Sequence, residues 1–336
     1  MTHYCGIDLH SNNHVVVVID ETDKRVYEKR LNNDLNLTLK ALDPYRYTLQ
    51  GVAVESTFNW YWLVDGLQEA GYPMHLVNTA AVKQYDGLKY SDDQHDAFWL
   101  AHLMRLGILP TGYIYPKEQR AVRDLLRRRL SLVHTASSQL ISVQSQIWRS
   151  LGIRIATGEL KKTSFQNPLP AGYTSLAVQA GLSVYQAVQQ EINQIEHVAF
   201  NAVKLSDDFK ILQTTTGIGT ILGLTIMLET GEIHRFAGPG NYASYCRCVD
   251  STRHSNGKKK GSGNAKAGNK YLSWAFSEAA HVAIRFEPLA KRFYDRKKAK
   301  TNGIIALRAV SRKLARASWM MLKHQTPYDA KLMFPG

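Results

Sequence analysis

The sequence predicts an α/β first third followed by a mainly helical remainder. Short runs rich in β-branched residues, of which 14–19 (HVVVVI) is the clearest, fit buried strands. Segments with apolar residues at helical spacing alternate with these runs, and after residue 117 such segments become long. Hydrophobic residues make up 44% of the 336 residues and charged residues 21%, which excludes disordered and fibrous classes.

Eight elements are expected in the first third. In chain order they are strands at 4–9, 14–19 and 25–30, a helix at 35–42, a strand at 51–54, a helix at 60–70, a strand at 73–77 and a helix from 92 to 107. Turn residues at 11–13 predict a hairpin between the first two strands. Three strands, a helix, a strand, a helix, a strand and a helix is the order of the ribonuclease-H-like fold.

Two long amphipathic helices are expected next, at 117–151 and 175–205, joined by a loop rich in Gly, Pro and Lys. They form either a coiled-coil arm or a helical pair packed on its own domain. The rest is mostly helical, with a Gly- and Lys-rich break at 256–269. The predicted division is therefore an α/β domain at 1–112, a long-helix region at 113–206 and a C-terminal domain at 207–336.

The charge is unevenly distributed along the chain. The total is +14, but residues 1–110 carry a net charge of −5 and residues 211–336 a net charge of +14. A concentrated basic excess predicts a polyanionic partner, by default nucleic acid, and the alternative is a solvated basic surface.

Several features predict a cytoplasmic, nucleoid-associated protein that does not meet a membrane. The longest mostly apolar run, 218–228, is shorter than the about 20 residues that cross a bilayer. The start MTHYCGIDLH lacks a signal pattern, and three cysteines cannot form a disulfide framework.

Four carboxylates follow or begin predicted elements. Asp8 ends the first strand, Glu55 follows the fourth, and Asp93 and Asp96 share one helix face. In a ribonuclease-H-like sheet the first and fourth strands are neighbours, so these acids should converge, repel one another and raise their own pKa values. Two Mg²⁺ ions about 4 Å apart would remove that cost and serve phosphoryl transfer. Asp92 competes with Asp93 for this role.

A Lys- and Gly-rich segment at 245–272 is the second candidate site. Glycines let a backbone approach phosphates, and lysines supply charge. Ser255 or Ser251 could attack a phosphodiester there, and the alternative is a flexible basic loop with incidental serines. The lysines expected to contact nucleic acid are Lys258, Lys259, Lys260, Lys266 and Lys270.

Two further features could bind a nucleic-acid backbone. The turn Gly217-Ile218-Gly219 precedes an apolar helix, so it either presents N–H groups to a phosphate or serves helix packing. Arginines at the start of the first long helix could contact duplex backbone or structured RNA. These are Arg120, Arg123 and Arg127.

Together these motifs resemble a known family. Cys5-Gly6-Ile7-Asp8, Val54-Glu55-Ser56 and Asp93-x-x-Asp96-Ala97 resemble the DEDD transposases of the insertion-sequence one-ten family, which includes the Piv-type DNA invertases. The Gly217 turn and the stretch from Ser255-Asn256-Gly257 to Ala267-Gly268-Asn269 resemble that family's C-terminal domain. The resemblance covers nearly the whole chain.

This resemblance implies a RuvC-like N-terminal domain, a coiled-coil arm and a C-terminal domain with a nucleophilic serine. It implies Mg²⁺ at Asp8, Glu55, Asp93 and Asp96. It also implies a bridge RNA that pairs with donor and target DNA, and a dimer or tetramer in which the carboxylates of one subunit meet the serine of another. The family's usual Ser-Gly is here Ser255-Asn256-Gly257, so Ser255 is the expected nucleophile and Ser251 the runner-up.

The expected reaction is a transposition in which Ser255 forms a 5′-phosphoserine and a freed 3′-OH of one DNA attacks the link on the other. A RuvC-like junction nuclease would use the same carboxylates with water as the nucleophile and leave no adduct. A sugar-kinase-like ATPase is a further alternative, because 5–12 resembles a phosphate-binding hairpin, but the sequence shows no second Gly-rich phosphate loop for it and the basic C-terminus would go unexplained. A non-catalytic RNA-binding protein would tolerate Asp8→Asn.

Overall fold

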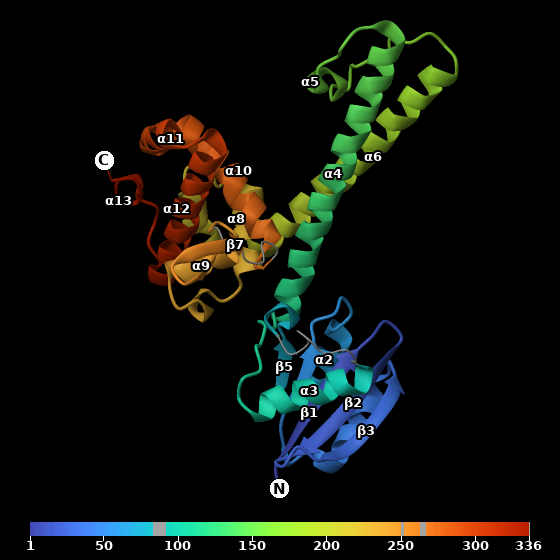
Figure 1. The fold of residues 1–336 in the computed structure, drawn as a ribbon. Coiled ribbons are helices and arrows are strands. Elements are labelled where there is room, and N and C mark those ends of the chain that lie inside the picture. Colours follow the sequence, from blue (N-terminus) through green and yellow to red (C-terminus); the bar gives the residue numbers. More distant parts are fainter. Residues whose placement is uncertain (83–91, 250–251, 263–266, 336) are drawn as a thin grey trace. The chain divides into compact units, whose positions relative to one another are not determined.

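The chain folds into two units, residues 1–117 and 118–336. They are seen in a computed structural model that describes residues 1–82, 92–249, 252–262 and 267–335 (Figure 1). The first unit is α/β and the second is mainly helical, which confirms the predicted fold class at this level. None of the described helices is long and apolar enough to span a membrane.

A five-stranded sheet forms the centre of the first unit, in the order β3-β2-β1-β4-β5 (Figure 1). The pairs β1–β2 and β2–β3 are antiparallel, whereas β1–β4 and β4–β5 are parallel. Both faces of β1 and β2 are buried, which explains the unbroken valine run of β2. The strands are β1 (His3–Leu9), β2 (Asn13–Asp20), β3 (Arg25–Asn32), β4 (Leu49–Glu55) and β5 (Met74–Val77).

Helices cover both faces of this sheet. Alternate residues of β1 and β2, including Ile7 and Val16, pack with α1 and α2, and the opposite set, including Val15 and Val17, packs with α3. Every element predicted in this region is present, with ends within a few residues of the expected ones. The helices are α1 (Leu35–Leu42), η1 (Asp43–Tyr45), α2 (Tyr61–Glu69), η2 (Thr79–Ala81) and α3 (Asp93–Arg105).

A glycine lets α3 lie directly against β1. A Cβ at Gly6 would come within 1.9 Å of the backbone oxygen of Ala97, so only glycine fits there. Asp92 caps the helix by accepting a hydrogen bond of 2.7 Å from the backbone N–H of His95. The close approach and the cap fix the first turn of α3 beside the end of β1.

Two long helices, α4 (Lys117–Leu151) and α6 (Tyr173–Val203), lie side by side in the second unit (Figure 1). They share a buried apolar cluster that includes Val143, Ile147 and Val178. The expectation of a plain loop between them was wrong in one respect, because a one-turn helix, α5 (Thr157–Leu160), forms there. Its Leu160 is buried in the same cluster, which gives that turn an apolar anchor.

Helices of varied length build the C-terminal core around Tyr242, Phe276 and Leu314. Gly217 has φ +103°, and a Cβ on it would lie 2.4 Å from the backbone oxygen of Ala279, so this turn packs against α10. The helices are α7 (Asp207–Gln213), α8 (Thr220–Thr230), η3 (Ile233–Arg235), α9 (Pro239–Tyr245), α10 (Lys270–Phe286), α11 (Pro288–Lys300), α12 (Gly303–His324) and α13 (Ala330–Met333).

A β-hairpin lies where the sequence predicted a break from residue 256 onward. Strands β6 (Thr252–Ser255) and β7 (Lys258–Ser262) pair antiparallel, with Ser255 opposite Lys258. Asn256 and Gly257 form the turn, with φ +51° and +70°. The helical pattern is therefore interrupted here, but by a hairpin that the sequence analysis did not anticipate, although Asn-Gly is the preferred dipeptide of such two-residue hairpin turns.

Candidate active site

Two of the predicted carboxylates lie at the ends of adjacent parallel strands. Ile7 of β1 pairs with Val54 of β4, so Asp8 and Glu55, the next residue on each strand, lie next to each other. Their side chains are hydrogen bonded. Asp93 and Asp96 lie in the first turn of α3, and the charge of Asp96 acts on Asp8. The sheet edge and the helix therefore bring the predicted acids of the first unit into one region.

Asp8 is the most deeply buried of these acids, with 3% of its surface exposed. Burial raises its pKa to about 7, and the hydrogen bond with Glu55 and the charges of Glu55 and Asp96 act in the same direction, against the lowering effect of His10. Its Oδ2 atom is buried and makes no hydrogen bond within the described part of the chain. A buried carboxylate oxygen without a donor, surrounded by further acids, is suited to a bound cation.

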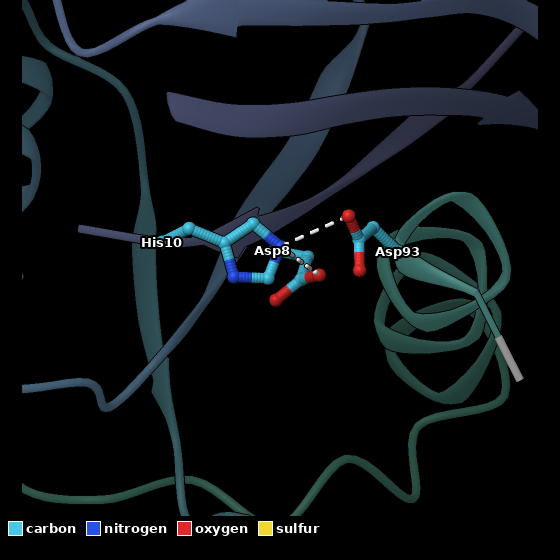
Figure 2. A group of neighbouring side chains, drawn as sticks. All are labelled: Asp8, His10 and Asp93. Atoms are coloured by element: carbon cyan, nitrogen blue, oxygen red, sulfur yellow. Dashed lines mark ion pairs between the residues drawn. The ribbon is translucent and has the colours of Figure 1, made fainter. Parts of the chain in front are cut away.

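His10 completes this group, and the sequence analysis missed it. Its Nε2 atom lies 3.1 Å from Asp8 Oδ2 and 3.2 Å from Asp93 Oδ2 (Figure 2). The three atoms all lie within 4.8 Å of one another. The spacing Asp8-x-His10 was the available signal, because His10 directly follows β1 and residues two apart in an extended segment face the same side.

Arg30 of β3 forms an ion pair with Asp93, and the sequence analysis missed this residue too. Its Nη2 lies 2.5 Å from Asp93 Oδ2, and its Nη1 donates to Asn13 Oδ1 at 2.8 Å. The hydrogen bond from Arg30 is the main reason that the pKa of Asp93 is lowered. Asp92, which competed with Asp93 in the sequence, instead caps α3.

The second candidate site is described only in part. Ser255 is the last residue of β6, at the hairpin turn, and its side chain lies outside the described set, as does that of Lys259. Ser251 and Lys266 fall outside the described residues altogether. Three lysines of the group have exposed side chains, namely Lys258, Lys260 and Lys270.

The arginines that were predicted to contact nucleic acid lie largely in the interior of the second unit. Arg120 and Arg123 are buried. Arg127 donates to both oxygens of buried Glu229, at 2.5 and 2.7 Å, and its guanidinium lies 4.6 Å from the centre of the Tyr271 ring. Nucleic-acid contact by these arginines and by the turn at Gly217 and Gly219 stays a prediction.

Comparison with known proteins agrees with this arrangement. A DEDD-type transposase family model matches residues 5–148, and a model described as the transposase IS116/IS110/IS902 family matches residues 209–295. The transposase for insertion sequence element IS1111A of Coxiella burnetii is 23% identical over 343 residues, which cover 96% of this chain and 90% of that protein. A putative transposase, y4qE, of Sinorhizobium fredii is 25% identical over 239 residues, which cover 68% of this chain and 57% of that protein.

The acid cluster of the first unit and these matches define an enzyme of the transposase class. Within that class, the chain belongs to the IS110 family.

Proposed function

We propose that this chain is a transposase that cuts and rejoins DNA through a phosphoserine intermediate, with Mg²⁺ held by Asp8, Glu55, Asp93 and Asp96 and with a bridge RNA as its guide. The observation that carries the proposal is the buried Asp8 carboxylate, which faces Glu55 and Asp96 and has an oxygen that no described residue hydrogen bonds with good geometry. We assign the first unit to the RuvC-like class because its strand order and its acids at the ends of β1 and β4 fit that class.

The residues present fit a divalent cation. The four acids supply oxygen ligands, which hard cations prefer, and a cation would offset the burial and the neighbouring acid charges that raise the pKa of Asp8. When bound, Mg²⁺ supplies positive charge to a phosphate oxygen at which negative charge develops. The chain's own part is to fix the acids: the β1–β4 pairing positions Asp8 and Glu55, and the cap at Asp92 and the contact at Gly6 position α3.

The nucleophile in this proposal is the hydroxyl of Ser255. This residue lies at a tight hairpin turn and pairs with exposed Lys258, and exposed Lys260 lies further along the same strand as Lys258. Attack on a phosphodiester would form a Ser–O–P bond to the 5′ end and release a 3′-OH. Attack by the 3′-OH of the other DNA would then restore the serine, and no ATP is needed because the number of phosphoester bonds is unchanged.

The proposed partners follow from charge and from the family. Residues 211–336 carry a net charge of +14, which suits donor DNA, target DNA and bridge RNA in the nucleoid. A homo-oligomer, either a dimer or a tetramer, belongs to the same proposal because both cleaved DNA ends must be held at once.

The test is a search for a covalent adduct. The full chain is incubated with element DNA, bridge RNA and Mg²⁺, and protein–DNA adducts are separated under denaturing conditions. We expect an adduct with the wild type and with Ser251→Ala, and none with Ser255→Ala. An adduct lost only in Ser251→Ala would move the nucleophile to that residue.

The same assay separates the alternative, a RuvC-like junction nuclease. The carboxylate cluster by itself would support such an enzyme, with water as the nucleophile. Cleavage without any adduct, unchanged in both serine variants, would favour the nuclease and reject the phosphoserine intermediate.

A further inference from the structure

His10 has a backbone that is fixed from three directions. Its N–H donates to the backbone oxygen of Asn13 at 2.9 Å. Its own backbone oxygen accepts hydrogen bonds from Asn33 Nδ2 at 3.0 Å and Asn59 Nδ2 at 2.9 Å. The start of β2, the segment between β3 and α1 and the segment before α2 therefore all hold this one residue in place.

The imidazole ring is directed between two carboxylates. Its Nε2 atom lies within 3.2 Å of Asp8 Oδ2 and of Asp93 Oδ2 (Figure 2). Nε2 and Asp8 Oδ2 are both buried, and neither makes a hydrogen bond with good geometry in the described part of the chain. Two carboxylate oxygens and one ring nitrogen thus lie within 4.8 Å of one another, and of these three atoms only Asp93 Oδ2 accepts a hydrogen bond of good geometry from a described residue, Arg30.

A ring nitrogen changes what such a site binds. Mg²⁺ prefers oxygen ligands throughout, whereas imidazole nitrogen suits transition metals, and Mn²⁺ is the transition metal that is also suited to carboxylate oxygen. A site with an imidazole should therefore discriminate between two cations of equal charge.

We propose that His10 is a metal ligand through Nε2, and that Asp8, His10 and Asp93 form a mixed oxygen–nitrogen site that takes Mn²⁺ in preference to Mg²⁺. This inference rests on the metal site of the proposed function and assigns it a residue and a selectivity. Arg30, which bonds to the same Asp93 oxygen, neutralises part of the acid charge from the β3 side.

The experiment measures binding of the metal alone to the full chain after removal of bound metals with a chelator. Mn²⁺ is titrated into the protein and followed by electron paramagnetic resonance, and electron spin echo modulation detects a coordinated imidazole nitrogen. We expect nitrogen modulation in the wild type. His10→Ala should remove it and weaken Mn²⁺ binding by about tenfold or more, while Mg²⁺ binding changes little.

His10→Gln is the second variant, because its amide oxygen reaches toward the position of Nε2. It should also lose the nitrogen signal, but it should shift the preference from Mn²⁺ toward Mg²⁺. His95→Gln is the matched control, since His95 lies on α3 beside the acids with its ring stacked on Trp99. Circular dichroism checks that each variant is folded.

The outcomes separate the two proposals. Mn²⁺ that binds without nitrogen modulation, and is lost in Asp8→Asn, would leave the metal site standing and reject His10 as a ligand. Nitrogen modulation that persists in both His10 variants would also reject His10 as a ligand. A wild type that binds neither Mn²⁺ nor Mg²⁺ would overturn the metal site of the proposed function together with this inference.

Discussion

Among the residues that the structure describes, each unit buries one carboxylate, and the two have opposite surroundings. Glu229 of α8 is 2% exposed and accepts hydrogen bonds from Arg127 Nε, Arg127 Nη2 and Asn269 Nδ2, at 2.5, 2.7 and 2.7 Å. Asp8 is 3% exposed, faces the acids Glu55 and Asp96, and has one oxygen without a hydrogen bond from any residue in the described ranges.

This difference indicates what each carboxylate is for. A buried charge that is fully paired holds elements together, and here the pair joins α4 to α8. Asn269 extends the link, because its Oδ1 caps α10 through the N–H groups of Tyr271 and Leu272. A buried charge that lacks compensation raises the free energy of the fold, so Asp8 is explained by binding rather than by stability.

The largest expected effect is at Glu229. Glu229→Ala leaves the Arg127 guanidinium and the Asn269 amide without their acceptor, so we expect a loss of roughly 3–5 kcal/mol in the free energy of unfolding. Denaturant titration measures it. Glu232→Ala is the control, since Glu232 is an exposed acid in the segment after the same helix. A loss below about 1 kcal/mol would mean that the network is not structural.

Asp8→Asn should change the free energy of unfolding in the opposite direction to Glu229→Ala. Without metal, the neutral amide removes the repulsion with Glu55 and Asp96, and we expect a gain of roughly 1–3 kcal/mol in the free energy of unfolding. The variant should also lose the rise in melting temperature that Mg²⁺ or Mn²⁺ gives the wild type. Glu69→Gln, at an exposed ion pair of the same unit, should change neither quantity. A destabilised metal-free Asp8→Asn would make Asp8 a structural carboxylate like Glu229.

The raised pKa of Asp8 also predicts a pH dependence for the metal-free protein. Its pKa is about 7 in the fold against an ordinary 3.8, so between these values the folded state binds more protons than the unfolded state. The contribution of Asp8 to stability is therefore fully present below about pH 4 and is lost as the pH rises through about 7. The measurement is the stability gap between Asp8→Asn and the wild type from pH 4 to 8. A gap that does not widen over this range would contradict the raised pKa.

Much of the first unit could be predicted from the sequence. β-Branched runs identified the strands, and the expected pairing of the first and fourth strands correctly placed Asp8 beside Glu55. Asp93 was preferred to Asp92, and the structure shows why both are aspartates, because one faces His10 and the other caps the helix.

The side-chain contacts between residues far apart in the sequence could not be predicted. His10 and Arg30 meet Asp93 from 83 and 63 residues away, and neither residue type is unusual at a strand end or edge. In the sequence, Glu229 is simply a polar residue near the end of an apolar helix, and its role is visible only once its partner Arg127, 102 residues upstream, is known. The hairpin was hidden by its Lys and Gly composition, although its Asn-Gly turn is a local signal.

The neighbouring aspartates at the start of α3 should give the smallest effects on stability. They also repeat, within one helix turn, the comparison between a carboxylate that stabilises the fold and one that serves binding. Asp92 is satisfied by a backbone N–H, so Asp92→Ala should cost about 1 kcal/mol of stability and leave DNA cleavage close to wild type. Asp93 is half-exposed and paired with Arg30, so Asp93→Ala should change stability by less than about 1 kcal/mol but abolish metal-dependent cleavage. Denaturant titration and a DNA cleavage assay, applied to both variants, separate the two roles. If Asp92→Ala abolished cleavage and Asp93→Ala did not, the assignment of the third acid would have to move to Asp92.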